Sequence, residues 1–155
     1  MIPVPPTRHI RQCFGCGPAN PESLGIALVA LPEGAEGRVC FGSDHQGAPG
    51  LVHGGLLATL LDEVMGFVQH AGDAVRVTAE MTVRYRRPVP VGTDLVCRAR
   101  VVDTTGRRLT MHAAITAAGD PERVLAEADA TYVVLEPRPG PGREPAPEPG
   151  ITDAS

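Results

Sequence analysis

The 155-residue sequence is poor in aromatic side chains, with no tryptophan, two tyrosines and three phenylalanines. Proteins that bind single-stranded nucleic acid stack the bases on aromatic rings, so base stacking is not expected here. An excess of positive charge is also missing, because 14 Lys and Arg side chains are outnumbered by 18 Asp and Glu side chains, giving a net charge of −4. We therefore expect no general attraction to nucleic acid.

The sequence also lacks long apolar runs. No stretch approaches the roughly 18 continuous apolar residues that a membrane span needs, and the first twelve residues, MIPVPPTRHIRQ, lack the apolar centre of a signal peptide. We expect neither a membrane protein nor a secreted one, and we expect a cytoplasmic location. In that reducing compartment the four cysteines, Cys13, Cys16, Cys40 and Cys97, should be thiols and not disulfides.

A complete zinc motif is missing as well. Cys13-x-x-Cys16 begins the segment CFGCGPANPESLGI and could supply half of a tetrahedral zinc site, but Cys40 and Cys97 are isolated and no paired histidines accompany them. We predict no metal site and no cofactor. Instead, we interpret the segment as a loop shaped by glycine and proline, in which both thiols pack as small apolar groups.

Composition divides the chain into three parts. Residues 1–12 are rich in proline and are predicted to form an extended arm, and residues 137–155, rich in proline and glycine, are predicted to be a disordered tail. The intervening residues 13–136 are expected to form one domain, because 43% of the chain is hydrophobic and can supply a core.

The longest segment with helical periodicity is GLVHGGLLATLLDEVMGFVQHAG, residues 50–72. Its apolar stripe consists of Leu56, Leu57, Leu60, Leu61, Val64, Phe67 and Val68. A second line carries little bulk and consists of Gly55, Ala58, Thr59, Asp62 and Gly66. Asp62 and Glu63 could simply face solvent. However, glycine costs roughly 1 kcal/mol relative to alanine inside a helix, so we favour a close approach of another backbone or a narrow ligand to Asp62.

Two-residue alternation of apolar and polar side chains predicts strands on either side of this helix. The expected strands cover residues 24–31, 36–43, 75–86, 95–102, 109–115 and 126–134. Residues 122–130 contain Glu and Ala, but their alternation favours strand over helix. We predict an α+β fold in which four long strands after the helix form an antiparallel meander, and in which the sheet wraps around the single helix.

This order of elements resembles the hotdog fold. His53-Gly54-Gly55 followed by Asp62 resembles the acyl-CoA thioesterases that include the phenylacetate-pathway (PaaI-type) enzymes. The segment YRRPVPVG, residues 85–92, is similar to a strand-end motif of that group, and the CFGCG opening resembles a subgroup with an N-terminal Cys-x-x-Cys-Gly segment. The resemblance extends over residues 13–135.

The resemblance implies a thioester hydrolase with four catalytic residues. The Gly54 N–H matches the donor that polarises the thioester carbonyl, and Asp62 matches the carboxylate that acts as nucleophile or general base. Thr78 matches a hydroxyl that positions water, and Gln46 lies close to where several relatives have an asparagine amide.

Further residues are candidates for contacts with an acyl-CoA substrate. His53 and Gly55 flank the catalytic glycine, although a histidine at a helix start favours a local structural role. His45 could line the acyl pocket or lie in water. Arg84 and Arg86 could bind the phosphates of coenzyme A. Equally, they could be the charged residues of an exposed sheet face that contacts no ligand.

Helix geometry places a condition on this chemistry. Gly54 and Asp62 are eight residues apart, which at ~1.5 Å per residue separates them by about 12 Å along one helix. They cannot flank one carbonyl carbon within a single chain. We therefore expect a homodimer, alone or as a dimer of dimers, in which antiparallel helices bring Asp62 of one chain to Gly54 of the other.

Two other functions are considered beside hydrolysis. A hotdog dehydratase or hydratase acting on hydroxyacyl thioesters could use His45 with Asp62 or Glu63, but the sequence lacks the Asp-x-Asn-Pro-x-His pattern of the hydratases. A non-catalytic module that binds acyl-CoA is the third alternative.

Overall fold

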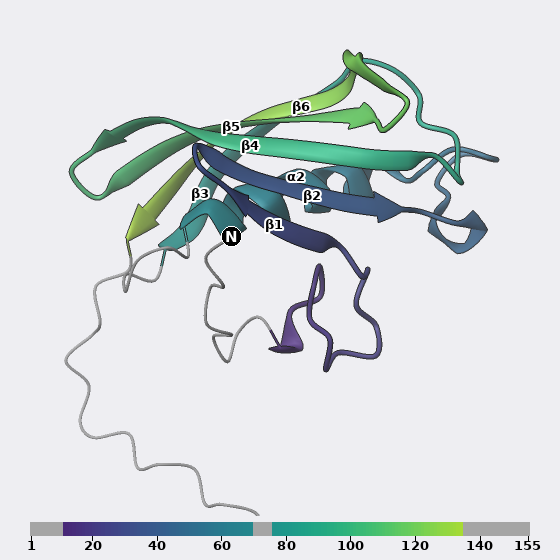
Figure 1. Cartoon of the computed structure of the whole chain (residues 1–155), viewed down its shortest axis with the longest axis horizontal. Coiled ribbons are helices and arrows are strands. Elements are labelled where there is room, and N and C mark those ends of the chain that lie inside the picture. The colour runs from purple at the N-terminus through teal and green to yellow at the C-terminus, as the bar shows by residue number, and fades with distance from the viewer. Residues whose placement is uncertain (1–10, 70–75, 135–155) are drawn as a thin grey trace, which may run out of the picture.

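The computed structural model describes residues 11–69 and 76–134. These residues form one antiparallel sheet of six strands, and a long helix, α2 (Gly54–Gln69), lies across one face of the sheet (Figure 1). Most of the predicted N-terminal arm and all of the predicted C-terminal tail lie outside the described residues. None of the helices in the described ranges has the length and apolar character needed to cross a lipid bilayer.

The six strands agree with the alternation in the sequence. They are β1 (Ala27–Leu31), β2 (Gly34–Cys40), β3 (Arg76–Tyr85), β4 (Asp94–Thr105), β5 (Arg108–Ala117) and β6 (Asp120–Val134). A short 3-10 turn, η1 (Ser43–His45), precedes α2. The expectation that residues 122–130 form strand and not helix is confirmed, and β4 continues three residues beyond the predicted end at Val102.

The order of strands in the sheet is β1-β2-β4-β5-β6-β3. The predicted meander of four consecutive strands is therefore wrong in one respect: β4, β5 and β6 follow one another, but β3 pairs with β6 at the edge of the sheet. Residues 86–93, which join β3 to β4, contain Pro88 and Pro90 and pass the start of α2, where the Val52 N–H donates to the Val89 carbonyl (2.8 Å). Hairpin loops span about 2–5 residues. This longer proline-containing linker forms no hairpin and instead carries the chain from the edge strand β3 to β4, which lies between β2 and β5.

The hydrophobic core lies between α2 and the concave face of the sheet. The helix buries one side, formed by Leu57, Leu60, Leu61, Val64 and Met65. Many of the buried sheet residues are small, including Cys97, Ala99, Ala113, Ala126, Ala128 and Ala130. Small side chains let the backbone of the sheet approach the helix closely, and Figure 1 shows the sheet arching over α2. The predicted α+β arrangement, a sheet wrapped around a single helix, is confirmed.

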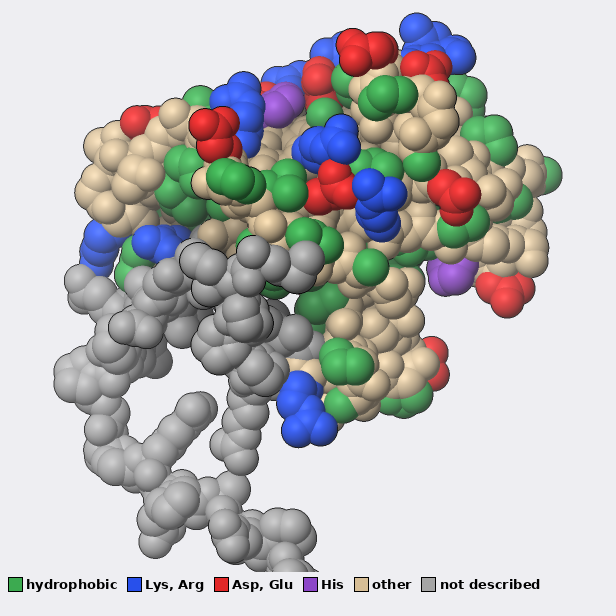
Figure 2. Space-filling view, in the orientation of Figure 1, with side chains coloured by type: hydrophobic (Ala, Val, Ile, Leu, Met, Phe, Trp, Pro, Cys, Tyr) green, Lys and Arg blue, Asp and Glu red, His purple; other side chains and the backbone are tan. Residues whose placement is uncertain are grey.

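The outer surface carries charges of both signs. Lys and Arg side chains lie interspersed with Asp and Glu side chains over the face seen in Figure 2. Figure 2 shows no continuous basic surface on this face. Ion pairs join the two signs among the described residues; Glu36, for example, pairs with both Arg38 (2.7 Å) and Arg98 (2.9 Å).

Gly37 on β2 sets the distance between the sheet and α2. A Cβ atom at this buried position would lie 2.4 Å from Cγ2 of Val64 and 3.3 Å from Cδ2 of Leu28. Valine in a helix has one strongly preferred rotamer, so Val64 cannot readily turn away. We expect Gly37→Ala to lower the free energy of unfolding by about 1–3 kcal/mol through overpacking, measured by urea denaturation.

The matched control is Gly119→Ala in the turn before β6. A Cβ atom there meets nothing within 4 Å, so a change of less than about 0.5 kcal/mol is expected. Equal stability of the Gly37 variant and the wild type would contradict the close helix–sheet contact.

Candidate active site

Asp62, in the middle of α2, is held by two hydroxyl groups from the sheet. Thr78 Oγ1 donates to Asp62 Oδ1 at 2.7 Å, and the Tyr132 hydroxyl donates to the same oxygen at 2.8 Å. The Tyr132 oxygen also lies 3.1 Å from the Asp62 main-chain carbonyl oxygen. Within residues 11–69 and 76–134, Oδ2 of Asp62 accepts no hydrogen bond. One carboxylate oxygen is therefore fixed, and the other is open to a reactant.

A β-bulge in β3 turns Thr78 toward Asp62. Regular alternation would place Thr78 on the opposite face of β3 from Met81. The pairing of β3 with β6 shifts between Thr78 and Glu80, so that Thr78 lies opposite Tyr132 while Met81 lies opposite Ala130. The extra residue in the bulge reverses the alternation, and Thr78 and Met81 face the helix together.

Tyr132 is a site residue that the sequence analysis missed. Its side chain is 1% exposed, and burial, reinforced by the neighbouring Asp62 carboxylate, raises the pKa of Tyr132 well above its usual range. The phenol therefore stays protonated and serves as a hydrogen-bond donor. A signal exists in the sequence, because Tyr132 follows Ala126, Ala128 and Ala130 on the buried face of β6, and a buried tyrosine hydroxyl needs a polar partner.

Gly54 begins α2 with its main-chain N–H available. The Gly55 N–H donates to His53 Nδ1 (2.9 Å), and the Leu56 N–H donates to the His53 carbonyl (2.9 Å). The Tyr85 hydroxyl donates to the carbonyl oxygen of Gly54 (2.9 Å). In the described part of the chain, the Gly54 N–H donates to no protein group. His53 therefore orders the first turn of the helix, and Gly54 supplies the open donor.

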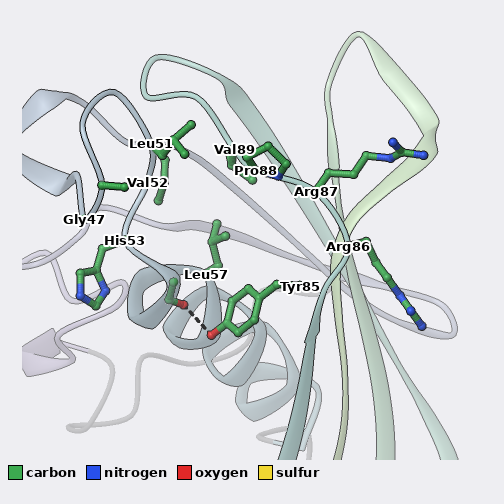
Figure 3. A pocket seen from close by; sticks show the side chains of 12 residues that line it. Gly47, Leu51, Val52, His53, Leu57, Tyr85, Arg86, Arg87, Pro88 and Val89 are labelled. Atoms are coloured by element: carbon green, nitrogen blue, oxygen red, sulfur yellow. Dashed lines mark hydrogen bonds between the residues drawn. The ribbon is translucent and has the colours of Figure 1, made fainter.

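This donor lies at a pocket of about 560 Å³. The pocket lies between the start of α2 and the segment that follows β3, and Figure 3 shows the Tyr85 ring beside the first turn of the helix. Its walls are formed by Gly47, Ala48, Leu51, Val52, His53, Gly54, Leu57, Tyr85, Arg86, Arg87, Pro88 and Val89. A mainly apolar lining with a few polar groups is typical of a small-molecule site.

The arginines near the pocket differ in their partners. Arg84 does not line the pocket: it pairs with Asp129 (2.6 Å), whose pKa is lowered by hydrogen bonds from His112 and Arg84. Arg86 lines the pocket and pairs with Glu127 (2.5 Å). Arg87 lines the pocket and forms no ion pair with any described residue, and Figure 3 shows both Arg86 and Arg87 extending away from the helix start.

Gln46 and His45 shape the loop before α2. Gln46 Oε1 accepts the Gly50 N–H (2.9 Å), and His45 Nδ1 accepts the Gly42 N–H (3.3 Å). The His45 ring also packs against the Phe41 ring, with 5.4 Å between centroids. Neither residue lines the pocket, and no hydrogen bond between described residues joins His45 to Asp62, which is the pair that dehydratase chemistry would use.

Asp62 does not line the pocket that contains Gly54. The two residues lie two turns apart on α2, about 12 Å along its axis. Glu63, the neighbour of Asp62, lies against a different segment, with both carboxylate oxygens 3.2 Å from Cys13 Sγ. The structure thus separates the predicted acid from the predicted oxyanion donor within one chain, while both lie beside the edge strand β3.

Comparison with known proteins identifies the family. The sequence profile of the "Thioesterase superfamily" matches residues 49–124, which include Gly54, Asp62, Thr78 and the whole segment from Tyr85 to Val89. The structure of the thioesterase superfamily protein RHA08564 superposes with a TM-score of 0.72 at 31% identity, covering 79% of this chain and 60% of that chain. This chain belongs to the hotdog-fold thioesterase superfamily.

Other relatives of this thioesterase-superfamily domain agree with the resemblance in the sequence. Acyl-coenzyme A thioesterase THEM4 of Bos taurus is 32% identical over 120 residues, covering 75% of this chain and 49% of the bovine protein. The chain spans about half the length of the curated relatives of this kind. A mutant of the phenylacetic acid degradation protein PaaI from Thermus thermophilus is 27% identical with a TM-score of 0.65, covering 74% of this chain and 96% of that one.

The Tyr132–Asp62 hydrogen bond can be tested through stability. Tyr132→Phe removes the buried donor to the carboxylate, and hydrogen bonds to charged groups contribute about 1.5–3 kcal/mol. We expect a loss of this size in the free energy of unfolding, measured by urea denaturation.

Tyr85→Phe provides the comparison, because this tyrosine is 55% exposed and donates to a neutral carbonyl. Its expected loss is about 0.5–1 kcal/mol. A Tyr132 variant that is no less stable than the Tyr85 variant would contradict the role given to Tyr132.

Proposed function

We propose that this domain hydrolyses acyl-CoA thioesters to a free acid and CoA, in a site shared by two chains. The observation that carries the proposal is the Asp62 carboxylate, fixed at Oδ1 by Thr78 and Tyr132 and open at Oδ2. Gly54 lines the pocket, and its N–H, which no described protein group accepts, supplies a donor for the thioester oxygen. Membership of the thioesterase superfamily and relatives named acyl-coenzyme A thioesterase support this choice of substrate.

Gly54 would stabilise the negative charge that develops on the thioester oxygen. Its N–H is one of the unpaired donors at the start of a helix, where the helix dipole also favours negative charge. A donor held in place before the reaction lowers the energy of the oxyanion without rearrangement, and removal of one such donor costs about 10²–10³ in kcat in a well-studied hydrolase.

Asp62 would act on the other side of the carbonyl carbon. As general base, its Oδ2 takes a proton from water while the water oxygen attacks the carbon. The tetrahedral intermediate then collapses, the C–S bond breaks with its electron pair on sulfur, and Asp62 returns the proton to the CoA thiolate. As nucleophile, Oδ2 would instead attack the carbon directly; the C–S bond breaks, the CoA thiolate leaves, and the acyl–Asp62 anhydride is hydrolysed by water to the free acid and the Asp62 carboxylate. Both routes need the open oxygen.

The edge of β3 offers a way to join two chains into one site. β3 pairs only with β6 in the described sheet, and its Val77 side chain is 39% exposed. Thr78, near one end of β3, contacts Asp62, while Tyr85, at the other end, contacts Gly54. If two β3 strands pair in antiparallel fashion, the Thr78 end of one lies opposite the Tyr85 end of the other. This pairing would bring Asp62 to Gly54 of the partner subunit.

The pocket has apolar walls and arginine side chains, which suit the apolar and the anionic parts of a CoA thioester. Pantetheine is narrow, and the apolar walls formed by Leu51, Val52, Leu57 and Val89 would accept an apolar group. CoA is polyanionic, and the Arg87 guanidinium, which forms no ion pair with a described residue, is available to its phosphates. Arg86, although it also lines the pocket, is already paired with Glu127.

Asp62→Asn tests the chemical step. The amide oxygen can still accept the hydrogen bonds from Thr78 and Tyr132, so the fold should persist, but the base and nucleophile are lost. We expect kcat to fall by at least about 10². Release of CoA thiol is measured with a chromogenic thiol reagent on a panel of aromatic, short-chain and medium-chain acyl-CoA substrates.

Asp94→Asn, at the exposed start of β4, removes the same charge and should retain wild-type turnover. Thermal unfolding of both variants separates loss of chemistry from loss of fold. Wild-type turnover by the Asp62 variant on the substrates that the wild type accepts would refute the role of Asp62.

Arg87→Ala tests the phosphate contact. Losing a charge-assisted hydrogen bond to a phosphate costs about 1.5 kcal/mol or more of binding free energy. We therefore expect KM to rise roughly tenfold and kcat to change little. Arg100→Ala, which removes an exposed arginine on β4 outside the pocket, is the control for net charge. Equal KM values for the two variants would show that Arg87 does not contact CoA.

A further inference from the structure

A second cluster of reactive side chains lies beside α2, at Glu63, the residue that follows Asp62. The Sγ atoms of Cys13 and Cys16 and a carboxylate oxygen of Glu63 all lie within 4.8 Å of one another. Both Glu63 oxygens are 3.2 Å from Cys13 Sγ. All three side chains are half-buried, and in the part of the chain described here no other three His, Cys, Asp or Glu side chains come together in this way.

Two buried glycines fit the N-terminal loop around this cluster. A Cβ atom at Gly15 would lie 2.6 Å from Cδ and Oε2 of Glu63, so a larger residue would displace the carboxylate. A Cβ atom at Gly17 would lie 2.4 Å from the main-chain nitrogen of Cys13. The Gly17 N–H donates to the Cys13 carbonyl (2.8 Å), which closes the turn that brings Cys16 beside Cys13.

The loop is also fixed to the body of the domain. The Leu24 N–H donates to the Phe14 carbonyl (2.8 Å), and the Ile26 N–H donates to the Gly15 carbonyl (2.9 Å). Ile26 is buried in the core directly before β1. The two thiols therefore reach Glu63 of α2 through a loop with defined hydrogen bonds, which is the purple segment that leads into β1 in Figure 1.

The charge of the cluster is not balanced by the protein. In residues 11–69 and 76–134, no Lys, Arg or His side chain forms an ion pair with Glu63. The Glu63 carboxylate accepts hydrogen bonds from the neutral Cys13 thiol, whereas charges removed from water are balanced by an opposite charge or by a metal ion. A divalent cation bound here would supply the missing positive charge and would replace the protons of the two thiols.

We propose that Cys13, Cys16 and Glu63 bind one Zn²⁺ ion, with water as the fourth ligand, and that the ion fastens the N-terminal loop to α2. Thiolates select zinc over Mg²⁺ and Ca²⁺, which prefer oxygen ligands. Bond lengths of about 2.3 Å to sulfur and 2.1 Å to oxygen in a tetrahedron put the ligand atoms about 3.6–3.8 Å apart. The observed separations require only small adjustments to reach this geometry.

This proposal replaces the expectation of no metal site that came from the sequence. The CxxC pair lacked a second pair of ligands along the chain, but the fold brings in Glu63, which is 50 residues after Cys13. The ion would lie beside the residue that follows Asp62. Its role would be to hold the loop on the helix, because the Asp62 side chain itself is turned toward Thr78 and Tyr132.

Metal analysis tests the proposal without reference to catalysis. The full chain, purified without a metal-binding tag and reduced under anaerobic conditions, is reconstituted with Zn²⁺ and, separately, titrated with Co²⁺. We expect one metal ion per chain by elemental analysis, together with thiolate-to-cobalt charge-transfer bands and the visible bands of a tetrahedral Co²⁺ site.

Variants assign the ligands. Cys13→Ser and Cys16→Ser should each abolish the tetrahedral cobalt spectrum, and Glu63→Gln should keep thiolate bands but weaken binding at least about tenfold. Cys40→Ser, which removes an exposed thiol on β2, should behave as the wild type. A chelator should lower the melting temperature of the zinc-loaded wild type but not that of the Cys13 variant.

Four results would overturn the proposal. A reduced wild type that binds no Zn²⁺ or Co²⁺ would exclude the site. Binding that survives in the two cysteine variants would place the metal elsewhere, and equal affinity of Glu63→Gln and the wild type would remove Glu63 from the ligand set. A Cys13–Cys16 disulfide that forms in place of metal binding would assign the pair to redox chemistry instead.

Discussion

The arrangement of this domain depends on the pair of hydroxyl groups that hold one carboxylate oxygen of Asp62. The acid comes from the central helix, Thr78 from the edge strand, and Tyr132 from the neighbouring strand. Because both donors meet the same oxygen, the helix cannot rotate or slide along the sheet without breaking them. The same contacts leave the second oxygen open. The two hydrogen bonds thus fix both the position of α2 along the sheet and the orientation of the Asp62 carboxylate.

The path of the chain around the sheet explains why Gly54 and Asp62 both lie beside one edge of the sheet. The proline-containing linker after β3 crosses the start of α2, so β3 remains an edge strand while β4 takes a place in the middle. Tyr85 at one end of β3 then contacts Gly54, and Thr78 near the other end contacts Asp62. An edge with open backbone groups readily pairs with another chain. The two halves of the proposed site lie along that edge.

Periodicity and local motifs predicted much of this from the sequence. The helix, the alternating strands and the helix start at His53-Gly54-Gly55 all follow from spacing within one segment. The contacts missed are those that join distant segments. The bulge that turns Thr78 inward is set by pairing with β6, and Tyr132 reaches Asp62 across 70 residues. The contact of Glu63 with the two cysteines was missed for the same reason, since only the fold brings Glu63 to the N-terminal loop.

The central claim is that Asp62 of one chain and Gly54 of the other form each site. Asp62→Asn and Gly54→Pro chains should each be inactive alone, because proline suits the first position of a helix but has no N–H. In a mixed dimer one site combines both defects and the other is intact. Mixed dimers isolated with two different tags should therefore recover about half of the wild-type turnover, which is one of the two equivalent sites. Mixed dimers as inactive as their parents would contradict the shared site.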